Sequence, residues 1–172
     1  APDAKKSHWL DVAVGGTLTV GSNAIVHARN KGFKPGNPLT NGGAPHGGAG
    51  AGTDAKTSAV YGSALAPLLP GTGCLTTGGS GNTNGGGAIR LTVAGATRID
   101  GLVDASGIYN GGSYCRAAAG GSVLLTAGAL SGAGSIRARG MDTGGGSNTG
   151  NGGGGRVAVV LTDPGAGFAN FD

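Results

Sequence analysis

Three short stretches with the same opening decide the fold of this chain. Residues 86–92 read GGAIRLT, residues 120–126 read GGSVLLT and residues 154–160 read GGRVAVV. Position 88 is followed by its counterparts 122 and 156, so the spacing is 34 residues both times. After its two glycines each stretch alternates apolar with other residues, which is the pattern of a β-strand with one buried face. The constant spacing indicates a structural repeat.

A second block follows the first in each repeat. Residues 101–107, GLVDASG, match residues 134–140, GSIRARG. The N-terminal region contains a looser copy of both blocks, since residues 9–16 read WLDVAVGG and residues 26–29 read VHAR. The repeat therefore extends back to the first strand-like stretch of the chain.

The two blocks predict an all-β protein folded as a parallel β-helix, that is, a β-solenoid, of about three coils with long glycine-rich loops. In the central coil we expect strands at 88–93, about 96–99 and 102–106, followed by a loop that returns to the next coil. Stacked coils would place Val26, Val103 and Ile136 in one interior column. Helical repeats also have periods near 34 residues, but they need long runs of helix-forming residues.

Glycine makes up 41 of the 172 residues, far above its usual share of roughly 7%. Such a composition is typical either of disorder or of backbones that lie very close together. Only 12% of the residues are charged, which favours the ordered alternative. We expect a single domain over residues 1–172, with an insertion at about 30–87 that folds against the solenoid as close-packed, polyglycine-type strands.

The charge and the cysteines indicate the compartment. A net charge of +4, from scattered basic residues, gives no run that would follow a nucleic acid, and no stretch is apolar for the roughly 18 residues of a membrane span. The opening APDA is typical of a mature terminus after signal-peptide cleavage, so we expect a secreted, extracellular or cell-surface protein. Cys74 and Cys115 predict one disulfide, with two unpaired thiols as the alternative.

Catalytic chemistry is poorly supported by the sequence. All eight acidic residues are aspartates, and only Asp100 and Asp104 could form a close pair. The histidines at 8, 27 and 46 lack metal-ligand spacing, and we expect each of them to have a solvated or capping role. No cofactor motif is present, so the sequence predicts a protein that is not an enzyme and holds neither metal nor cofactor. Instead His27, Asp104 and Arg137 are predicted to form one outward column, an exposed ladder of charges.

The pattern of two glycines, any residue, Ile or Val, any residue, Leu or Val, then Thr, followed by AGALSGAGSIRARG at 127–140 and a Gly/Asn/Ser-rich loop, resembles repeats in large glycine-rich bacterial surface proteins. It is also similar to the passenger regions of autotransporter-type adhesins. The resemblance covers residues 85–163 well and 9–30 loosely, and leaves out the insertion at 33–84. It implies a β-solenoid outside the cell and brings no catalytic residues with it.

The leading functional hypothesis is self-assembly. The sequence begins and ends near corresponding strands of a coil, so copies could continue the repeat head to tail, as a homopolymer that forms a filament or a surface layer. The terminal segments 1–8 and 163–172 would act as arms across the junction. Candidate contact residues come from the first strand, the last strand and the C-terminal arm: Trp9, Leu10, Val12, Val157, Val159, Leu161, Phe168 and Phe171.

Three other functions are weighed against assembly. An adhesin-type module would bind glycans or a cell surface, and its sign would be an exposed cluster of Phe33, Tyr61, Tyr109 and Tyr114. A polysaccharide-degrading enzyme would need more acids converging than the sequence offers. Ice binding would need a flat column of threonines, which the chain lacks, because Arg98 takes the position matching Thr19.

Overall fold

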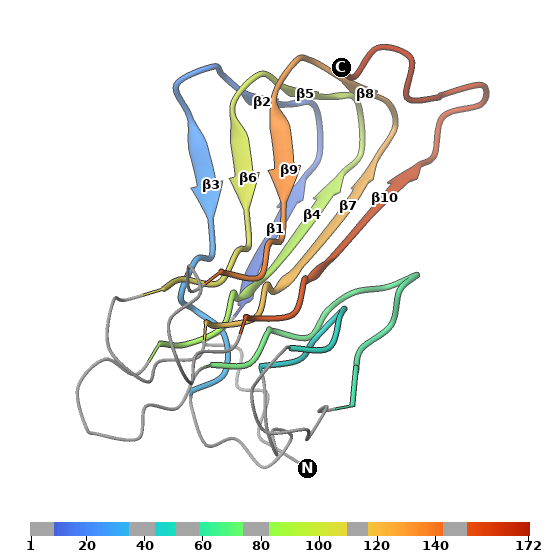
Figure 1. Cartoon of the computed structure of the whole chain (residues 1–172). Helices are drawn as coiled ribbons and strands as arrows, with labels where there is room; N and C mark the ends of the chain where they lie inside the picture. Colours follow the sequence, from blue (N-terminus) through green and yellow to red (C-terminus); the bar gives the residue numbers. More distant parts are fainter. Residues whose placement is uncertain (1–8, 35–43, 51–58, 74–82, 110–116, 143–150) are drawn as a thin grey trace, which may run out of the picture.

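The computed structural model describes residues 9–34, 44–50, 59–73, 83–109, 117–142 and 151–172. Within them the chain forms ten β-strands and no helix (Figure 1). The strands make three parallel sheets, of order β1-β4-β7-β10, β2-β5-β8 and β3-β6-β9. Their bounds are β1 Trp9–Val14, β2 Leu18–Val20, β3 Ile25–His27, β4 Ala88–Val93, β5 Thr97–Ile99, β6 Leu102–Asp104, β7 Ser122–Ala127, β8 Leu130–Ser131, β9 Ser135–Arg137 and β10 Arg156–Leu161. This all-β stack of parallel strands is consistent with a parallel β-solenoid.

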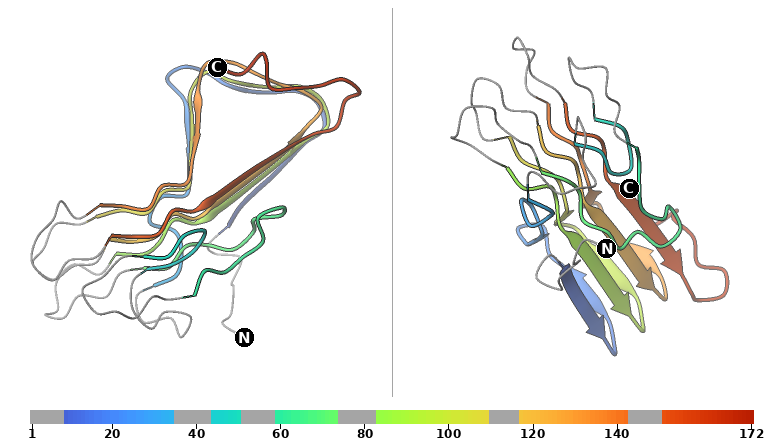
Figure 2. Two further views of the ribbon diagram at one scale, coloured as in Figure 1. Left: turned by 45° about the vertical axis from the view of Figure 1, so that its right-hand side comes forward. Right: turned by 90° about the horizontal axis from the view of Figure 1, so that it is seen from below.

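The register of the long sheet follows the spacing of the sequence blocks. Trp9 lies beside Ala88, Ala88 beside Ser122, and Ser122 beside Arg156. Successive passes of the chain therefore overlay when the molecule is viewed as in Figure 2, left. Strand β4 has the predicted bounds, whereas β5 and β6 are shorter than predicted. Strand β6 ends early because the next residue, Ala105, already bonds to two different segments: its N–H donates to Arg137 and its carbonyl accepts from Gly121.

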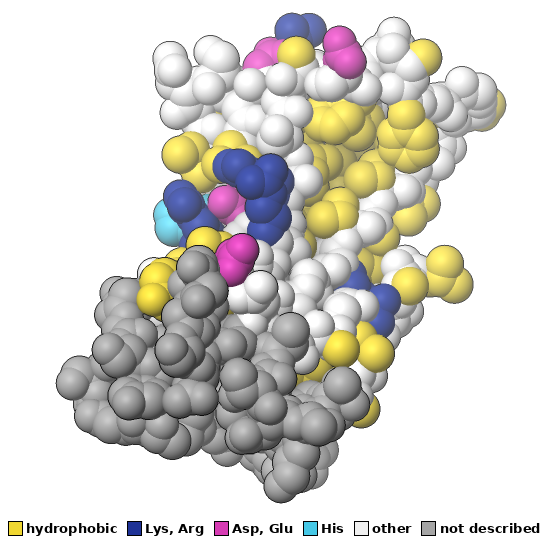
Figure 3. All heavy atoms as spheres, in the orientation of Figure 1, with side chains coloured by type: hydrophobic (Ala, Val, Ile, Leu, Met, Phe, Trp, Pro, Cys, Tyr) yellow, Lys and Arg dark blue, Asp and Glu magenta, His cyan; other side chains and the backbone are white. Residues whose placement is uncertain are grey.

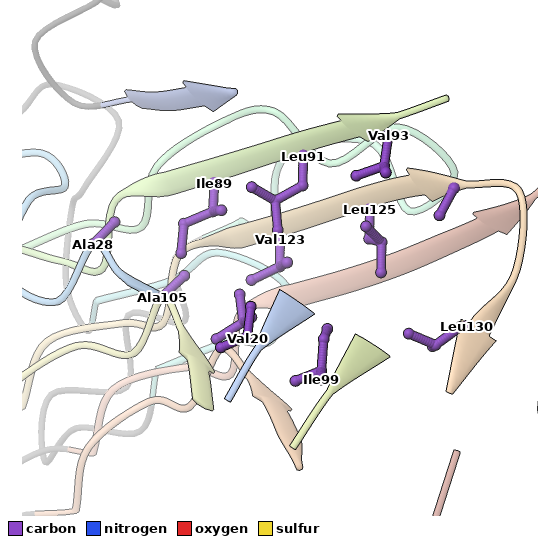
Figure 4. Packing of buried hydrophobic residues seen from close by; sticks show 12 residues of the cluster. Val20, Ala28, Ile89, Leu91, Val93, Ile99, Ala105, Val123, Leu125 and Leu130 are labelled. Carbon is purple, nitrogen blue, oxygen red and sulfur yellow. The ribbon is translucent and has the colours of Figure 1, made fainter. Parts of the chain in front are cut away.

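The interior of this three-sheet body is filled by the apolar residues of alternating positions. Ile89, Leu91 and Val93 of β4 are at most 3% exposed, and Val123 and Leu125 of β7 are fully buried. These side chains point from the long sheet toward the two short ones (Figure 4). Because side chains alternate across a strand, one face of each strand supplies the core and the other face stays outside.

A glycine-rich layer lies beside the three-sheet body, where the chain leaves β3, β6 and β9 and before it enters β4, β7 and β10 (Figures 1 and 2). It comprises residues 30–34, 44–48, 69–73, 83–87, 105–109, 117–121, 138–142 and 151–155. Segment 117–121 lies at its centre, and its residues 118–121 form backbone hydrogen bonds with several different segments. The Ala119 N–H donates to Thr72, its carbonyl accepts from Gly86, and the Gly120 N–H donates to Gly153. The layer is thus held together by backbone hydrogen bonds in several directions.

Glycine is required where these backbones approach most closely. A Cβ atom built on Gly86 would overlap the carbonyl oxygen of Ala105, and one built on Gly121 would overlap the carbonyl oxygen of Gly87. Neither carbonyl can move without breaking the hydrogen bonds that hold its segment. Close packing of backbones thus explains why glycine stands at these positions.

Candidate functional site

The first candidate site is the end of the body formed by β1, β2 and β3, called here the β1 end. In β1, Leu10, Val12 and Val14 lie in the same interior columns as Ile89, Leu91 and Val93 of β4. They are only partly buried, whereas the β4 residues beside them are at most 3% exposed. Among the described residues β1 pairs with β4 alone, so this end offers an unpaired strand edge and half-covered apolar side chains.

The opposite end, called here the β10 end, has the same character. Val157, Val159 and Leu161 continue the interior columns of β7, and the side chain of Val157 is 44% exposed. Within the described part of the chain β10 pairs only with β7. Figure 3 shows hydrophobic side chains gathered between β9 and β10 at this end. All eight predicted contact residues thus lie in the strands of the two ends or in the C-terminal segment. Trp9 differs from the rest of its group because it is half-buried on the outward face of β1.

The C-terminal segment after β10 follows the path of the strand below it. Thr162 and Asp163 donate their N–H groups to Ala127 and Gly128, at 2.9 and 3.0 Å, and Phe171 forms a parallel bridge with Gly132. Phe171 packs against the core of its own chain. Backbone pairing thus draws this segment onto the body of its own chain. Phe168, 56% exposed, is the aromatic side chain that this segment presents to solvent.

The predicted charged column exists as a register, but its centre is not exposed. His27 lies beside Asp104, and Asp104 beside Arg137. Asp104 is only 3% exposed, because Arg29 and Arg137 lie over its carboxylate at 3.5 and 3.8 Å. Its other oxygen accepts the N–H of Ser106 at 2.9 Å. The expectation of an exposed ladder is therefore wrong at Asp104. It was based on the residues of one column, whereas Arg29 covers Asp104 from the neighbouring column.

A second column, two residues further along the same segments, was missed by the sequence analysis. It holds Arg29, Ser106 and Arg139, and the Arg139 N–H donates to the Ser106 hydroxyl at 3.0 Å. Extending the alternation of the repeat by two positions would have found it. The two columns together form what is called here the charged face: His27, Arg29, Asp104, Ser106, Arg137 and Arg139. Figure 3 shows its basic side chains grouped on one side of the body.

Of the solvated or capping role expected of it, His46 does not have the solvated one, because it is buried. Its ring is fully buried, with Nδ1 2.8 Å from the carbonyl oxygen of Gly120. Burial lowers the pKa of His46, the hydrogen bond to Gly120 opposes this, and the charge of Arg156 lowers it further. The Tyr61 ring packs on the imidazole with centroids 4.8 Å apart, and burial raises the pKa of its hydroxyl, which donates to Pro70. No pattern in the sequence marks this histidine for burial.

The surroundings of His46 are those of a structural contact. The Ser122 hydroxyl lies 3.5 Å from Nε2 but donates to the carbonyl of Leu69 at 2.6 Å. With Ser122 and His46 both fully buried, a substrate has no access to this pair. The cluster ties segments 44–50 and 59–73 to β7 and β10, and Arg156 adds a bond from Nε to the Tyr61 carbonyl.

The remaining candidates are dispersed or lie outside the described residues. Cys74 and Cys115, the predicted disulfide, fall outside them. Asp100 is held by Arg98 at 2.6 Å, which lowers the pKa of Asp100, and it does not share a site with Asp104. In the described ranges no three His, Cys, Asp or Glu side chains gather where they could hold a metal ion. No helix there is long and apolar enough to cross a bilayer.

The aromatic platform expected of an adhesin is not formed by the residues that the structure describes. Phe33 is 4% exposed, Tyr61 packs on His46, and Tyr114 lies outside the described part. Tyr109, 36% exposed, is what remains of the predicted cluster. Comparisons of the chain with protein-family models, with curated proteins and with solved structures find no match. The functional argument therefore depends on the geometry of the two ends and the charged face.

Proposed function

We propose that this protein is a structural, extracellular β-solenoid of about three coils, with long glycine-rich loops, that assembles head to tail into a filament or surface layer. The β1 end of one copy would meet the β10 end of the next. Each junction would cover apolar side chains and strand edges that an isolated copy leaves in contact with water. The secreted location rests on the composition and on the cysteine pair of the sequence.

The observation that carries the proposal is the burial along one interior column. Leu10, Ile89, Val123 and Val157 lie in register, one strand above another. The two central residues are fully buried, whereas Leu10 is partly exposed and Val157 is 44% exposed. A second copy stacked at the strand spacing of about 4.8 Å would place its Leu10 against Val157. The column would then be continuous through the junction.

The test compares two substitutions in the same strand. Val157 and Val160 are 44% and 43% exposed, but Val157 belongs to an interior column and Val160 to the outward face beside Thr126. Val157→Lys would place a charge within the junction, and Val160→Lys would add the same charge beside it. By light scattering, we expect Val157→Lys to raise the concentration for half-assembly at least about tenfold, and Val160→Lys less than about threefold.

A mixing experiment determines the polarity of the contact. Leu10→Lys would block the β1 end and Val157→Lys the β10 end, so neither variant alone should form polymers. A mixture pairs the intact β10 end of the first variant with the intact β1 end of the second, and we expect dimers only. A wild-type protein that stays monomeric at about 1 mM, or one that stops at a symmetric dimer, would overturn the proposal. Negative-stain images of the wild type distinguish a filament from a layer.

The second candidate function is a module that binds glycans or a cell surface. The described residues do not form the aromatic cluster that would have favoured such a module. The charged face instead favours a module that binds its glycan through basic side chains. A polysaccharide-degrading enzyme has no such support, because Asp100 and Asp104 are held by different arginines.

A further inference from the structure

The charged face is a regular array of two columns and three rows. Its four corners are basic side chains, His27 and Arg29 on the first pass of the chain and Arg137 and Arg139 on the third. The two central positions, Asp104 and Ser106, are at most 5% exposed. Since adjacent strands are about 4.8 Å apart, the two basic rows are separated by about 10 Å. Strand pairing holds this spacing for His27, Asp104 and Arg137, and in the second column the Arg139 N–H donates to the Ser106 hydroxyl.

The charges of the array do not cancel. Three arginines against one aspartate leave two positive charges, with His27 counted as neutral. The ion pairs at 3.5 and 3.8 Å are longer than ordinary hydrogen bonds, so Arg29 and Arg137 keep donors for another acceptor. The side chains of these two arginines are 44% and 32% exposed, and Arg139 is exposed as well. Asp104 therefore orients two guanidinium groups without using all of their hydrogen bonds.

The chemistry of these groups selects the ligand. Guanidinium groups bind carboxylates and sulfates through paired, planar hydrogen bonds. The six array positions include no Phe, Tyr or Trp on which a nucleic-acid base could stack, which is the usual second contribution in single-strand binding. Two basic rows at a fixed separation suit a polymer that carries an acidic group on successive sugar units. We propose that the charged face binds an acidic polysaccharide bearing carboxylate or sulfate groups.

The binding test uses Val157→Lys protein, so that assembly does not multiply the contacts. The probes are polygalacturonate and dextran sulfate, with neutral dextran and a single-stranded DNA oligomer as comparisons, measured by biolayer interferometry at about 0.15 M salt. Arg29→Gln with Arg139→Gln removes two corners of the array. Arg90→Gln with Arg98→Gln removes the same charge from the other two sheets, where each arginine pairs with an aspartate. Thermal melts check that both double variants remain folded.

We expect the array variant to weaken binding of at least one acidic polysaccharide by about tenfold or more, and the control by less than about threefold. Asp104→Asn should strengthen binding, because it removes the central negative charge while its side-chain oxygen still accepts the Ser106 N–H. If both double variants lost the same amount of binding affinity, binding would depend on net charge alone, and this would overturn the proposal. So would equal binding of neutral dextran, or tighter binding of DNA. None of these results depends on whether the ends assemble.

Discussion

Two neighbouring glycines show how strongly a single position can determine the close packing of the glycine-rich layer. A Cβ on Gly155 would overlap the carbonyl oxygen of Gly121, whereas a Cβ on Gly154 would meet nothing within 4 Å. We predict that Gly155→Ala destabilises the fold by about 3 kcal/mol or more, through overpacking against backbone. Gly154→Ala should be neutral or stabilising by about 0.5 kcal/mol, because it restricts the unfolded chain. Denaturant unfolding of the two variants makes the comparison.

His46 makes the stability of the fold depend on pH in a definite direction. Burial holds its folded pKa below the value of 6.5 that it has when exposed. The unfolded chain therefore binds the proton first as the pH falls. We predict that the free energy of unfolding is highest above about pH 6.5 and declines as the pH drops from there toward the lower folded pKa.

His46→Gln is the matched variant, since its amide can still donate to the Gly120 carbonyl. Urea unfolding at about pH 7.5 and about pH 5.5 should show a smaller difference for this variant than for the wild type. An equal difference in both proteins would place the pH dependence elsewhere. Burial raises the pKa of Tyr61, whose ring packs on His46, so this hydroxyl does not change charge in that range.

At the scale of the strands, identical residues in one column should differ in importance according to their position in the stack. Val123 in β7 is fully buried and Val157 in β10 is 44% exposed, although the two are register partners. We predict that Val123→Ala costs about 2 kcal/mol, from two buried carbons and the cavity that they leave. Val157→Ala should cost less than about 1 kcal/mol in the monomer. Unfolding at low protein concentration measures both values, and equal costs would contradict the exposed end.

The strands were largely predictable from the sequence because side-chain alternation encodes them. Ile89, Leu91 and Val93 recur at a constant spacing, and the register of β4 with β7 follows from it. The glycine-rich layer could not be predicted in detail, since hydrogen bonds between glycine backbones leave no pattern of side chains. The burial of His46 depends on that layer and was missed for the same reason. The cover of Arg29 over Asp104 was missed because Arg29 lies in the neighbouring column, two residues beyond the one that was predicted.

For the whole molecule, the two proposed interactions should respond to salt in opposite ways. Contact between the apolar ends depends on the hydrophobic effect, whereas polysaccharide binding depends on exposed arginines. We predict that raising sodium chloride from about 0.05 to about 0.5 M leaves the assembly concentration unchanged within about twofold, or lowers it. The same change should weaken polysaccharide binding more than about tenfold. Light scattering and interferometry on one preparation test both, and assembly that dissolves in salt would contradict apolar ends.

The hydrogen-bonded glycine segments have a consequence for how this protein would look to a spectroscopist. The amides of Gly86, Ala119 and Gly120 are all engaged, yet none of them belongs to a β-strand. A far-ultraviolet spectrum, interpreted as a sum of helix, strand and coil, would assign these residues to coil. Deuterium would nonetheless enter them slowly, because an amide must release its acceptor before it exchanges. Residues that an optical method would count as unstructured polypeptide thus have their amides in hydrogen bonds, as the strands do.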